Sequence, residues 1–244
     1  MFMFRSLRHL TALLVATGVT MCAWPASAQI VNSIQFGAGG LVPRGFDSRA
    51  QGDVLVADLT NDTPLLFFVN DFRSGQVFGE WNVGLGQHVE IGAGVGFFQR
   101  TVPSIYADLV NKKNGSEIDQ RLRLRMVPIT GLVRFLPFGR AGEVQPYVGA
   151  GIAAVSFRYS ESGQFVDTSD FSVFDARFTA SGVAPGAVLL GGVRLPLGGD
   201  IYGLSLEGRY QFATGNTGGA DAGFLDDKID LSGGSFNVGF LVRF

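Results

Sequence analysis

The sequence is poor in cysteine, in histidine and in charge. Among 244 residues there are one cysteine, Cys22, and two histidines. Only 16% of the residues are charged, whereas a soluble domain usually carries about a quarter. The formal net charge is −2 with no basic block, which argues against a nucleic-acid partner. A lipoprotein modified at Cys22 is the less favoured alternative, since Met21 stands where a small residue should precede a lipidated cysteine.

Long apolar runs are also missing, except for one at the N-terminus. Arg5 and Arg8 precede an apolar stretch over residues 10–23, and the small residues Ala26, Ser27 and Ala28 follow. This is the pattern of a secretory signal peptide, residues 1–28, cleaved after Ala28. The stretch is shorter than the ~20 apolar residues that a spanning helix needs. Cleavage removes the only cysteine, so the mature chain forms no disulfide and has no thiol chemistry.

The rest of the chain alternates apolar residues with small or polar ones, the period of a β-strand with two different faces. In residues 201–212, Glu207 and Arg209 share the face opposite the leucines. Turning these charges to lipid would cost on the order of several kcal/mol, so they are predicted to face a barrel interior. The last strand is the clearest, because one of its faces carries Phe236, Val238, Phe240, Val242 and Phe244.

Eight such strands are predicted, and most reach the ~9–11 residues that cross a bilayer at a tilt. They cover residues 31–42, 75–85, 87–101, 119–136, 144–160, 185–196, 201–212 and 235–244. Short glycine-rich turns alternate with long loops at 43–74, 102–118, 161–184 and 213–229. This predicts an all-β fold: an eight-stranded antiparallel transmembrane β-barrel with short periplasmic turns and long extracellular loops.

The alternation is irregular in one of these strands. In 119–136, arginines at every second position alternate with apolar residues, but Ile129 and Val133 share the arginines' parity. A bulge at Pro128 would reset the two faces. In 144–160 the aromatic face is assigned to lipid, which turns Arg158 inward. The aromatic residues of that face are Tyr147, Phe157 and Tyr159, which together with Tyr202 and Phe244 are predicted to form part of two aromatic girdles.

Charged residues are predicted to fill the lumen. A barrel of eight strands is only wide enough for side chains, and buried charges must be paired. Ion pairs that close the lumen are therefore favoured over a gated polar path. The candidates are Glu80, Glu90, Arg158, Arg194, Glu207 and Arg209, with Arg134 added if the bulge at Pro128 exists.

Two segments resemble a known family. The terminal strand 235–244 resembles the C-terminal assembly signal of outer-membrane proteins, and residues 144–151 resemble the "PYVGAG" strand of small barrels of the OmpA/OmpW type. By pattern the resemblance covers residues 29–244. It implies a monomer that the barrel assembly machinery inserts into the bacterial outer membrane, in contact with outer-membrane lipid and lipopolysaccharide. It carries over no catalytic residue and no cofactor.

No catalytic, cofactor or metal site is predicted. His88 is the only histidine of the mature chain, lies beside a short turn and has no serine two residues on, so it is read as a solvated side chain. The glycines of 92–96 lie inside a strand and do not open a helix, which disfavours nucleotide binding. The aspartates of the last two long loops fit no calcium loop and are read as a solvated rim. They are Asp167, Asp170, Asp175, Asp221, Asp226, Asp227 and Asp230.

The expected function is a non-enzymatic outer-membrane barrel with a structural or surface-interaction role. The alternative is a narrow channel or carrier for small hydrophobic solutes, as in OmpW-like barrels, and a lipid-modifying enzyme ranks last. The apolar run 64–69 lies in the first long loop, and it is predicted to cap the barrel mouth.

Overall fold

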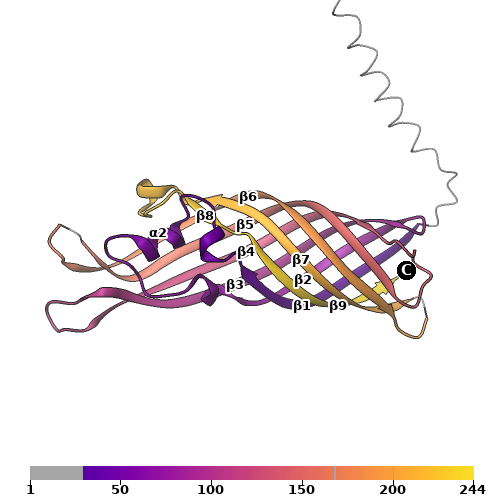
Figure 1. The fold of residues 1–244 in the computed structure, drawn as a ribbon, viewed down its shortest axis with the longest axis horizontal. Helices are drawn as coiled ribbons and strands as arrows, with labels where there is room; N and C mark the ends of the chain where they lie inside the picture. Colours follow the sequence, from indigo (N-terminus) through magenta and orange to yellow (C-terminus); the bar gives the residue numbers. More distant parts are fainter. Residues whose placement is uncertain (1–29, 168, 200) are drawn as a thin grey trace, which may run out of the picture.

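The structure, a computed structural model, describes residues 30–167, 169–199 and 201–244. The predicted signal peptide lies outside the described residues. Each long strand pairs antiparallel with the next, and the last closes on the first, so the predicted eight-stranded barrel is confirmed (Figure 1). The strands are β1 (Val31–Pro43), β2 (Ser74–Leu85), β3 (Val89–Val110), β4 (Glu117–Phe135), β5 (Gln145–Val166), β6 (Val173–Pro196), β7 (Tyr202–Asn216) and β9 (Gly233–Arg243).

Short elements lie in two of the connections. The β1–β2 connection holds the 3-10 helices η1 (Phe46–Ser48) and η2 (Val69–Phe72) and the helix α2 (Val54–Thr60) between them. The β7–β9 connection holds η3 (Gly219–Ala222) and the short strand β8 (Lys228–Asp230), which pairs with the end of β7. In the described ranges, no helix has the length and apolar character required to cross a membrane.

The β3–β4 and β5–β6 hairpins project far beyond the other strands, on the left of Figure 1. Their strands are 19 to 24 residues long, against 11 to 15 for β1, β2, β7 and β9. The long loops predicted at 102–118 and 161–184 are therefore wrong, because most of both segments is strand. We call this side of the barrel the hairpin end and the opposite side the short-turn end.

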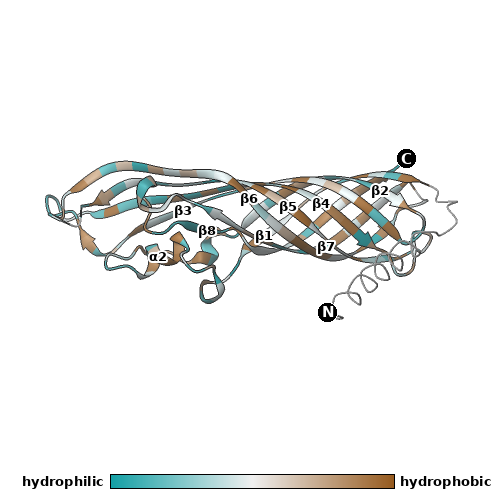
Figure 2. Cartoon of the chain, turned by 90° about the horizontal axis from the view of Figure 1, so that it is seen from above, coloured by the Kyte–Doolittle hydropathy of each residue, from teal (hydrophilic) through white to brown (hydrophobic). Residues whose placement is uncertain are grey.

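Near the short-turn end, the outward side chains are apolar. Figure 2 shows apolar segments along the strands of this barrel wall. An exposed apolar surface of this extent marks contact with something other than water, and on a closed barrel it forms the band that faces lipid. The exposed residues of this band include Ile34, Trp81, Ile91, Ile129, Val133, Ile152, Leu189, Leu206 and Val238.

Beyond the apolar band, towards the hairpin end, the outward faces of the strands carry charged residues and the inward faces carry apolar ones. The register of β4 with β5 continues without a shift through Val127, Pro128 and Ile129, so the predicted bulge at Pro128 is wrong. The arginines before Pro128 therefore point outward like Ile129. The inward side chains there are apolar and buried, namely Leu122, Leu124 and Met126. The same alternate residues point outward along the whole of β4. Near the short-turn end they face lipid, and towards the hairpin end they face water.

The same inversion corrects β5. Tyr159 has none of its surface exposed, and Tyr147, Val155 and Phe157 are buried as well. These side chains face the barrel interior, so the prediction that they contact lipid is wrong. Arg158 lies between two of them on the strand and is consequently exposed on the outer wall. Its predicted place in the lumen is also wrong.

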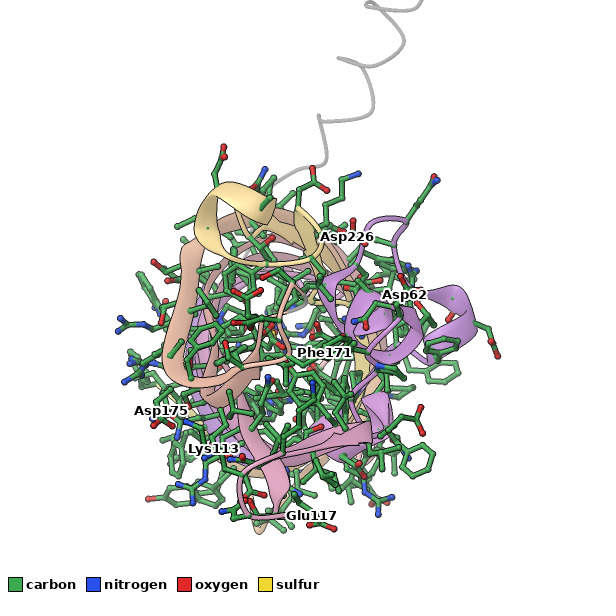
Figure 3. The ribbon with its side chains drawn as sticks, turned by 90° about the vertical axis from the view of Figure 1, so that its left-hand side faces the viewer. Asp62, Lys113, Glu117, Phe171, Asp175 and Asp226 are labelled. Atoms are coloured by element: carbon green, nitrogen blue, oxygen red, sulfur yellow. The ribbon has the colours of Figure 1, made fainter. Side chains whose placement is uncertain are left out.

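The β1–β2 connection, residues 44–73, covers the hairpin end, and we call this connection the cap. Val54 and Leu55 of α2 and Phe72 of η2 are buried in the apolar core formed by the extended strands. The backbone of Leu66 donates to Ile105 and that of Ala107 donates to Pro64, so this segment continues the sheet along β3 where β2 has ended. Figure 3 looks onto this end and shows side chains filling the space between the strands.

The prediction that residues 64–69 cap the barrel mouth is confirmed for every second residue of this segment. Leu65, Phe67 and Val69 are buried, whereas Leu66 and Phe68 point outward and are exposed. This is the alternation expected of a segment paired to a strand edge, with one face on the core.

Candidate functional site

Arg134 occupies the centre of the barrel near the short-turn end. Its Nη1 donates to Oδ1 of Asn82 at 2.7 Å, and its Nη2 donates to Oε2 of Glu207 at 3.2 Å. Nη2 also donates to Glu80. The side chain is fully buried, and Glu80, Asn82 and Glu207 are buried around it. A single guanidinium therefore links β4 with β2 and β7 across the interior.

Two further arginines complete the network. Arg194 of β6 binds Glu90 of β3 with both terminal nitrogens, at 2.8 and 2.7 Å. Arg209 binds Glu207 at 2.6 Å and also binds Glu80. Within this set three glutamates face three arginines, and a further arginine, Arg140, approaches Glu90 at 4.0 Å. We call Glu80, Glu90, Glu207, Arg134, Arg194 and Arg209 the lumen network.

Tyr147 joins the network from β5. Its hydroxyl donates to Oε2 of Glu207 at 3.0 Å, and its ring lies against both Arg134 and Arg194, with guanidinium carbons 5.6 and 5.0 Å from the ring centroid. Reading the sequence missed this role because Tyr147 resembles a residue of an aromatic girdle. Arg134 was predicted only on condition of the bulge at Pro128, yet it faces inward without one.

Glycines of β3 make room for these side chains. A Cβ atom at Gly94 would lie 2.7 Å from Cγ of Glu80 and 2.9 Å from Oγ1 of Thr130. At Gly92 it would lie 2.3 Å from Oδ1 of Asn82. All three distances are too short for a carbon atom, so the interior holds these polar and charged side chains only because Gly92 and Gly94 lack side chains.

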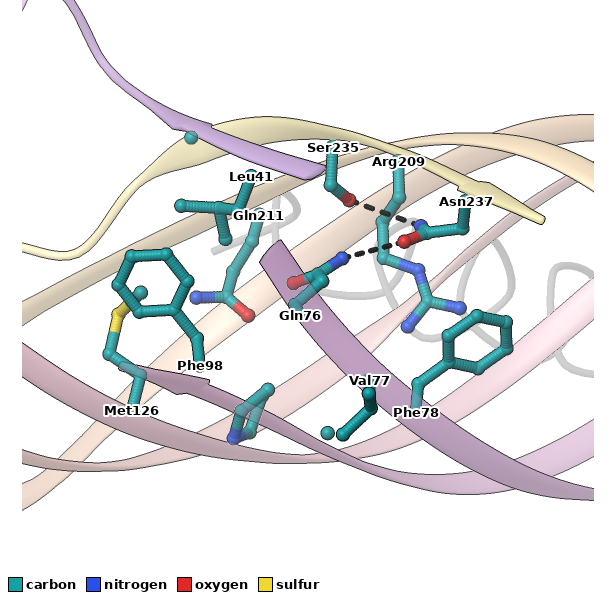
Figure 4. A pocket seen from close by; sticks show the side chains of 13 residues that line it. Leu41, Gln76, Val77, Phe78, Phe98, Met126, Arg209, Gln211, Ser235 and Asn237 are labelled. Atoms are coloured by element: carbon teal, nitrogen blue, oxygen red, sulfur yellow. Dashed lines mark hydrogen bonds between the residues drawn. The ribbon is translucent and has the colours of Figure 1, made fainter. Parts of the chain in front are cut away.

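The interior continues above the network as a small cavity lined by both polar and apolar side chains, and then as an apolar core. The cavity measures about 30 Å³ and lies between Arg209 and the side chains of Phe98 and Met126 (Figure 4). Gln76 donates to Asn237 at 2.7 Å and Asn237 donates to Ser235 at 3.2 Å on its wall. A space of this size holds about one water molecule.

The other candidates from the sequence do not assemble a reactive site. His88 is exposed in the β2–β3 turn, and its Nδ1 donates to the carbonyl of Leu136 at 2.9 Å. Within the described residues, no three histidine, cysteine, aspartate or glutamate side chains gather in a way that could hold a metal ion. Of the candidate assembly residues, Phe236, Val238, Phe240 and Val242 alternate on the outward face of β9, and Phe244 follows the end of this strand.

Asp230 departs from the predicted solvated rim. It is buried, pairs with Arg44 at 3.4 Å and accepts hydrogen bonds from the backbones of Ala50 and Ser232. Its role is structural, because it ties the last connection to the first. The other aspartates of the predicted rim are partly or fully exposed.

Comparison with known proteins returned structures but no sequence relative. No protein-family model matches the sequence, and no curated protein matches it. The N-terminal β-barrel domain of Pseudomonas aeruginosa OprF is 12% identical, with 89% of this chain and 98% of that chain covered and a TM-score of 0.39. Neisserial surface protein A is 11% identical, with 88% of this chain and 96% of that chain covered and a TM-score of 0.43. Escherichia coli outer membrane protein W is 18% identical, with 87% of this chain and 98% of that chain covered and a TM-score of 0.39.

At these scores the fold assignment rests on the chain's own strand pairing. That pairing gives a closed ring of antiparallel strands with an apolar outer band and a charged interior. The chain has the fold of a small eight-stranded outer-membrane β-barrel protein.

Proposed function

We propose that this chain is an integral protein of the bacterial outer membrane whose lumen is closed and whose role is structural or surface-interacting. In this proposal the signal peptide is removed near Ala28, and the barrel assembly machinery inserts the mature chain as a monomer. The short turns face the periplasm and the hairpin end faces outward, surrounded by outer-membrane lipid and lipopolysaccharide.

The lumen network is the observation that carries the proposal. Arg134 and Glu207 are fully buried, and each bonds to at least two other members of the network. A conducting pore needs a water-filled path, whereas these charges are desolvated and already paired with one another. The apolar core and the cap over the hairpin end add a second closure above the first.

A carrier of small hydrophobic solutes is the second candidate, but no specific observation favours it. Such a carrier needs an apolar path from the barrel mouth to the lateral wall, and the apolar side chains at that height are packed together in the core. An enzyme is disfavoured because His88 lies in a short turn. Lipid A mass spectra from cells with and without the gene test this point, and an acyl change that depends on His88 would contradict the proposal.

Conductance in planar bilayers tests the closed lumen. We expect the purified wild-type barrel, checked for folding by its heat-modified gel mobility, to form no stable large channels. A variant carrying Glu80→Ala and Arg134→Ala keeps equal numbers of opposite charges and should show more frequent brief openings. Stable large channels from the wild-type protein would overturn the proposal.

A further inference from the structure

Five arginines lie together on the outer wall, just beyond the apolar band. Arg121, Arg123 and Arg125 are successive outward residues of β4. The register places Arg125 directly opposite Arg158 of β5 and places Ser162 of β5 between Arg121 and Arg177 of β6. We call Arg121, Arg123, Arg125, Arg158 and Arg177 the arginine face.

The arginine face encloses a pocket. Arg123, Arg125, Arg158 and Arg177 line a cavity of about 100 Å³ together with Ser160. Ser160 shares the outward face of β5, yet only 4% of its surface is exposed, because the arginines cover it. The pocket is thus walled by guanidinium groups and has a hydroxyl group at its base.

No described acid forms an ion pair with this cluster, although the exposed Asp119 and Asp175 lie two residues from Arg121 and Arg177 on the same strand faces. Among the residues that the structure describes, none of the five arginines forms an ion pair, and Arg125 only approaches the ring of Phe97, at 5.4 Å. Like charges directly opposite each other on neighbouring strands are destabilising. An anion in the pocket would relieve this repulsion. The cluster is therefore better explained as an anion-binding site than as a feature that stabilises the fold.

The height of the arginine face identifies the anion. On β4, Arg125 lies four residues beyond Ile129 of the apolar band, and on β5, Arg158 lies four residues beyond the outward Ala154. With a rise of about 3.3 Å per strand residue, both arginines lie at the level of the lipid headgroups on the hairpin side. Guanidinium groups bind phosphate oxygens through paired hydrogen bonds.

We propose that the arginine face binds the phosphate groups of lipid A in the outer leaflet. The inference rests on the proposed orientation, in which the hairpin end faces outward. The phosphorylated sugars of lipid A present several anionic groups at one height, which matches arginines spread over three adjacent strands. The sites that phosphate would occupy are the pocket itself and the outward edge formed by Arg121 and Arg177.

The test compares two variants of equal charge change. The first carries Arg123→Gln, Arg125→Gln and Arg158→Gln; the control carries Arg73→Gln, Lys112→Gln and Lys113→Gln, which alter exposed cations outside the pocket. Native mass spectrometry of the folded proteins, released from detergent micelles, measures binding of bisphosphorylated lipid A, dephosphorylated lipid A and phosphatidylglycerol. Wild type and control should prefer bisphosphorylated lipid A, and the first variant should bind it about tenfold more weakly.

Two results would overturn the inference. One is equal binding of bisphosphorylated lipid A by the first variant and the wild type. The other is equal binding of lipid A and phosphatidylglycerol by the wild type, which would reduce the arginine face to a general contact with anionic headgroups. Failure of the proposed function is recognised separately, because an unfolded or channel-forming wild type shows itself in gel mobility and conductance before any lipid is added.

Discussion

Arg134 and Glu207 meet across the barrel interior, with Nη2 of Arg134 donating to Oε2 of Glu207 at 3.2 Å. The two residues belong to β4 and β7, which are not neighbours in the ring of strands. Their contact therefore crosses the lumen and does not merely reinforce a strand pair. It places paired charges across the middle of the interior, as the proposed closed lumen requires.

Removing Arg134 should strongly destabilise the barrel. Arg134→Ala leaves Glu80 and Glu207 buried with one cation between them, Arg209, and breaking a buried ion pair costs about 3–5 kcal/mol. Urea unfolding of the protein in lipid vesicles measures the change in the free energy of unfolding. Arg73→Ala is the matched control, since that arginine is exposed, belongs to neither the lumen network nor the arginine face, and should change stability little. Equal effects of the two substitutions would contradict the lumen network.

Adding a methyl group at Gly94 should also be destabilising. The new Cβ would lie 2.7 Å from Cγ of Glu80, and overpacking of this kind costs about 1–3 kcal/mol. Gly79→Ala is the control, because a Cβ there meets nothing within 4 Å. The temperature at which the heat-modified gel band disappears should fall for Gly94→Ala and stay near wild type for Gly79→Ala. Similar shifts for both variants would argue against a crowded interior.

The cap depends on its inward aromatic residues. Phe72 has none of its surface exposed, so Phe72→Ala should cost about 3–5 kcal/mol of stability at the hairpin end. Phe68, 76% exposed, is the comparison within the same connection and should tolerate alanine. Limited proteolysis of the first connection in folded protein reports the difference. A cap that is cut no faster in Phe72→Ala than in Phe68→Ala would contradict its assigned packing.

The cap should lose stability as the pH rises. Asp58 of α2 is buried, and burial followed by the nearby Glu161 and Asp53 carboxylates raises its pKa well above the ordinary 3.8. Arg49 binds the neighbouring Asp53 through two hydrogen bonds. The Tyr159 hydroxyl donates to Asp58 at 3.5 Å, and this bond opposes the rise in the pKa only in part. Between pH 3.8 and the raised pKa, the folded state therefore holds a proton that the unfolded state releases, and stability falls with rising pH.

Asp58→Asn removes this titration. In wild type, limited proteolysis of the first connection should be slower at about pH 5 than at about pH 8. The asparagine variant should show a weaker dependence over the same interval. Slower proteolysis of wild type at the higher pH would reverse the assigned sign.

The sequence predicts the membrane half of the barrel well and the hairpin end poorly. Near the short turns, strand alternation has one meaning: apolar residues such as Ile91 face lipid, while Glu90 faces inward. Beyond the band the alternation persists but its meaning inverts, because water now lies outside and an apolar core lies inside. The alternation therefore predicts the correct spacing of Phe157 and Arg158 but the wrong face for each, since Phe157 is buried inside and Arg158 is exposed outside.

The residues of the lumen network also differ in how well the sequence predicts their direction. Glu80, Glu90 and Glu207 lie on strands whose outward faces are plainly apolar, so their inward direction could be inferred from parity. Tyr147 could not, since an aromatic residue near a strand end suits a lipid interface as well as an interior hydrogen bond. The cap could be located from its apolar run, but its pairing with β3 depends on where β2 ends.

Single-cysteine labelling on β5 tests the inversion most directly. The only cysteine of the chain is Cys22 in the predicted signal peptide, so the mature protein provides a background without thiols. Ile152 and Arg158 lie on the same outward face, and Ile152 is 74% exposed on the apolar band. In folded protein in lipid vesicles, a water-soluble maleimide should label Arg158→Cys and leave Ile152→Cys unmodified. Both should react after unfolding, and rapid labelling of Ile152→Cys in the folded protein would contradict the membrane assignment.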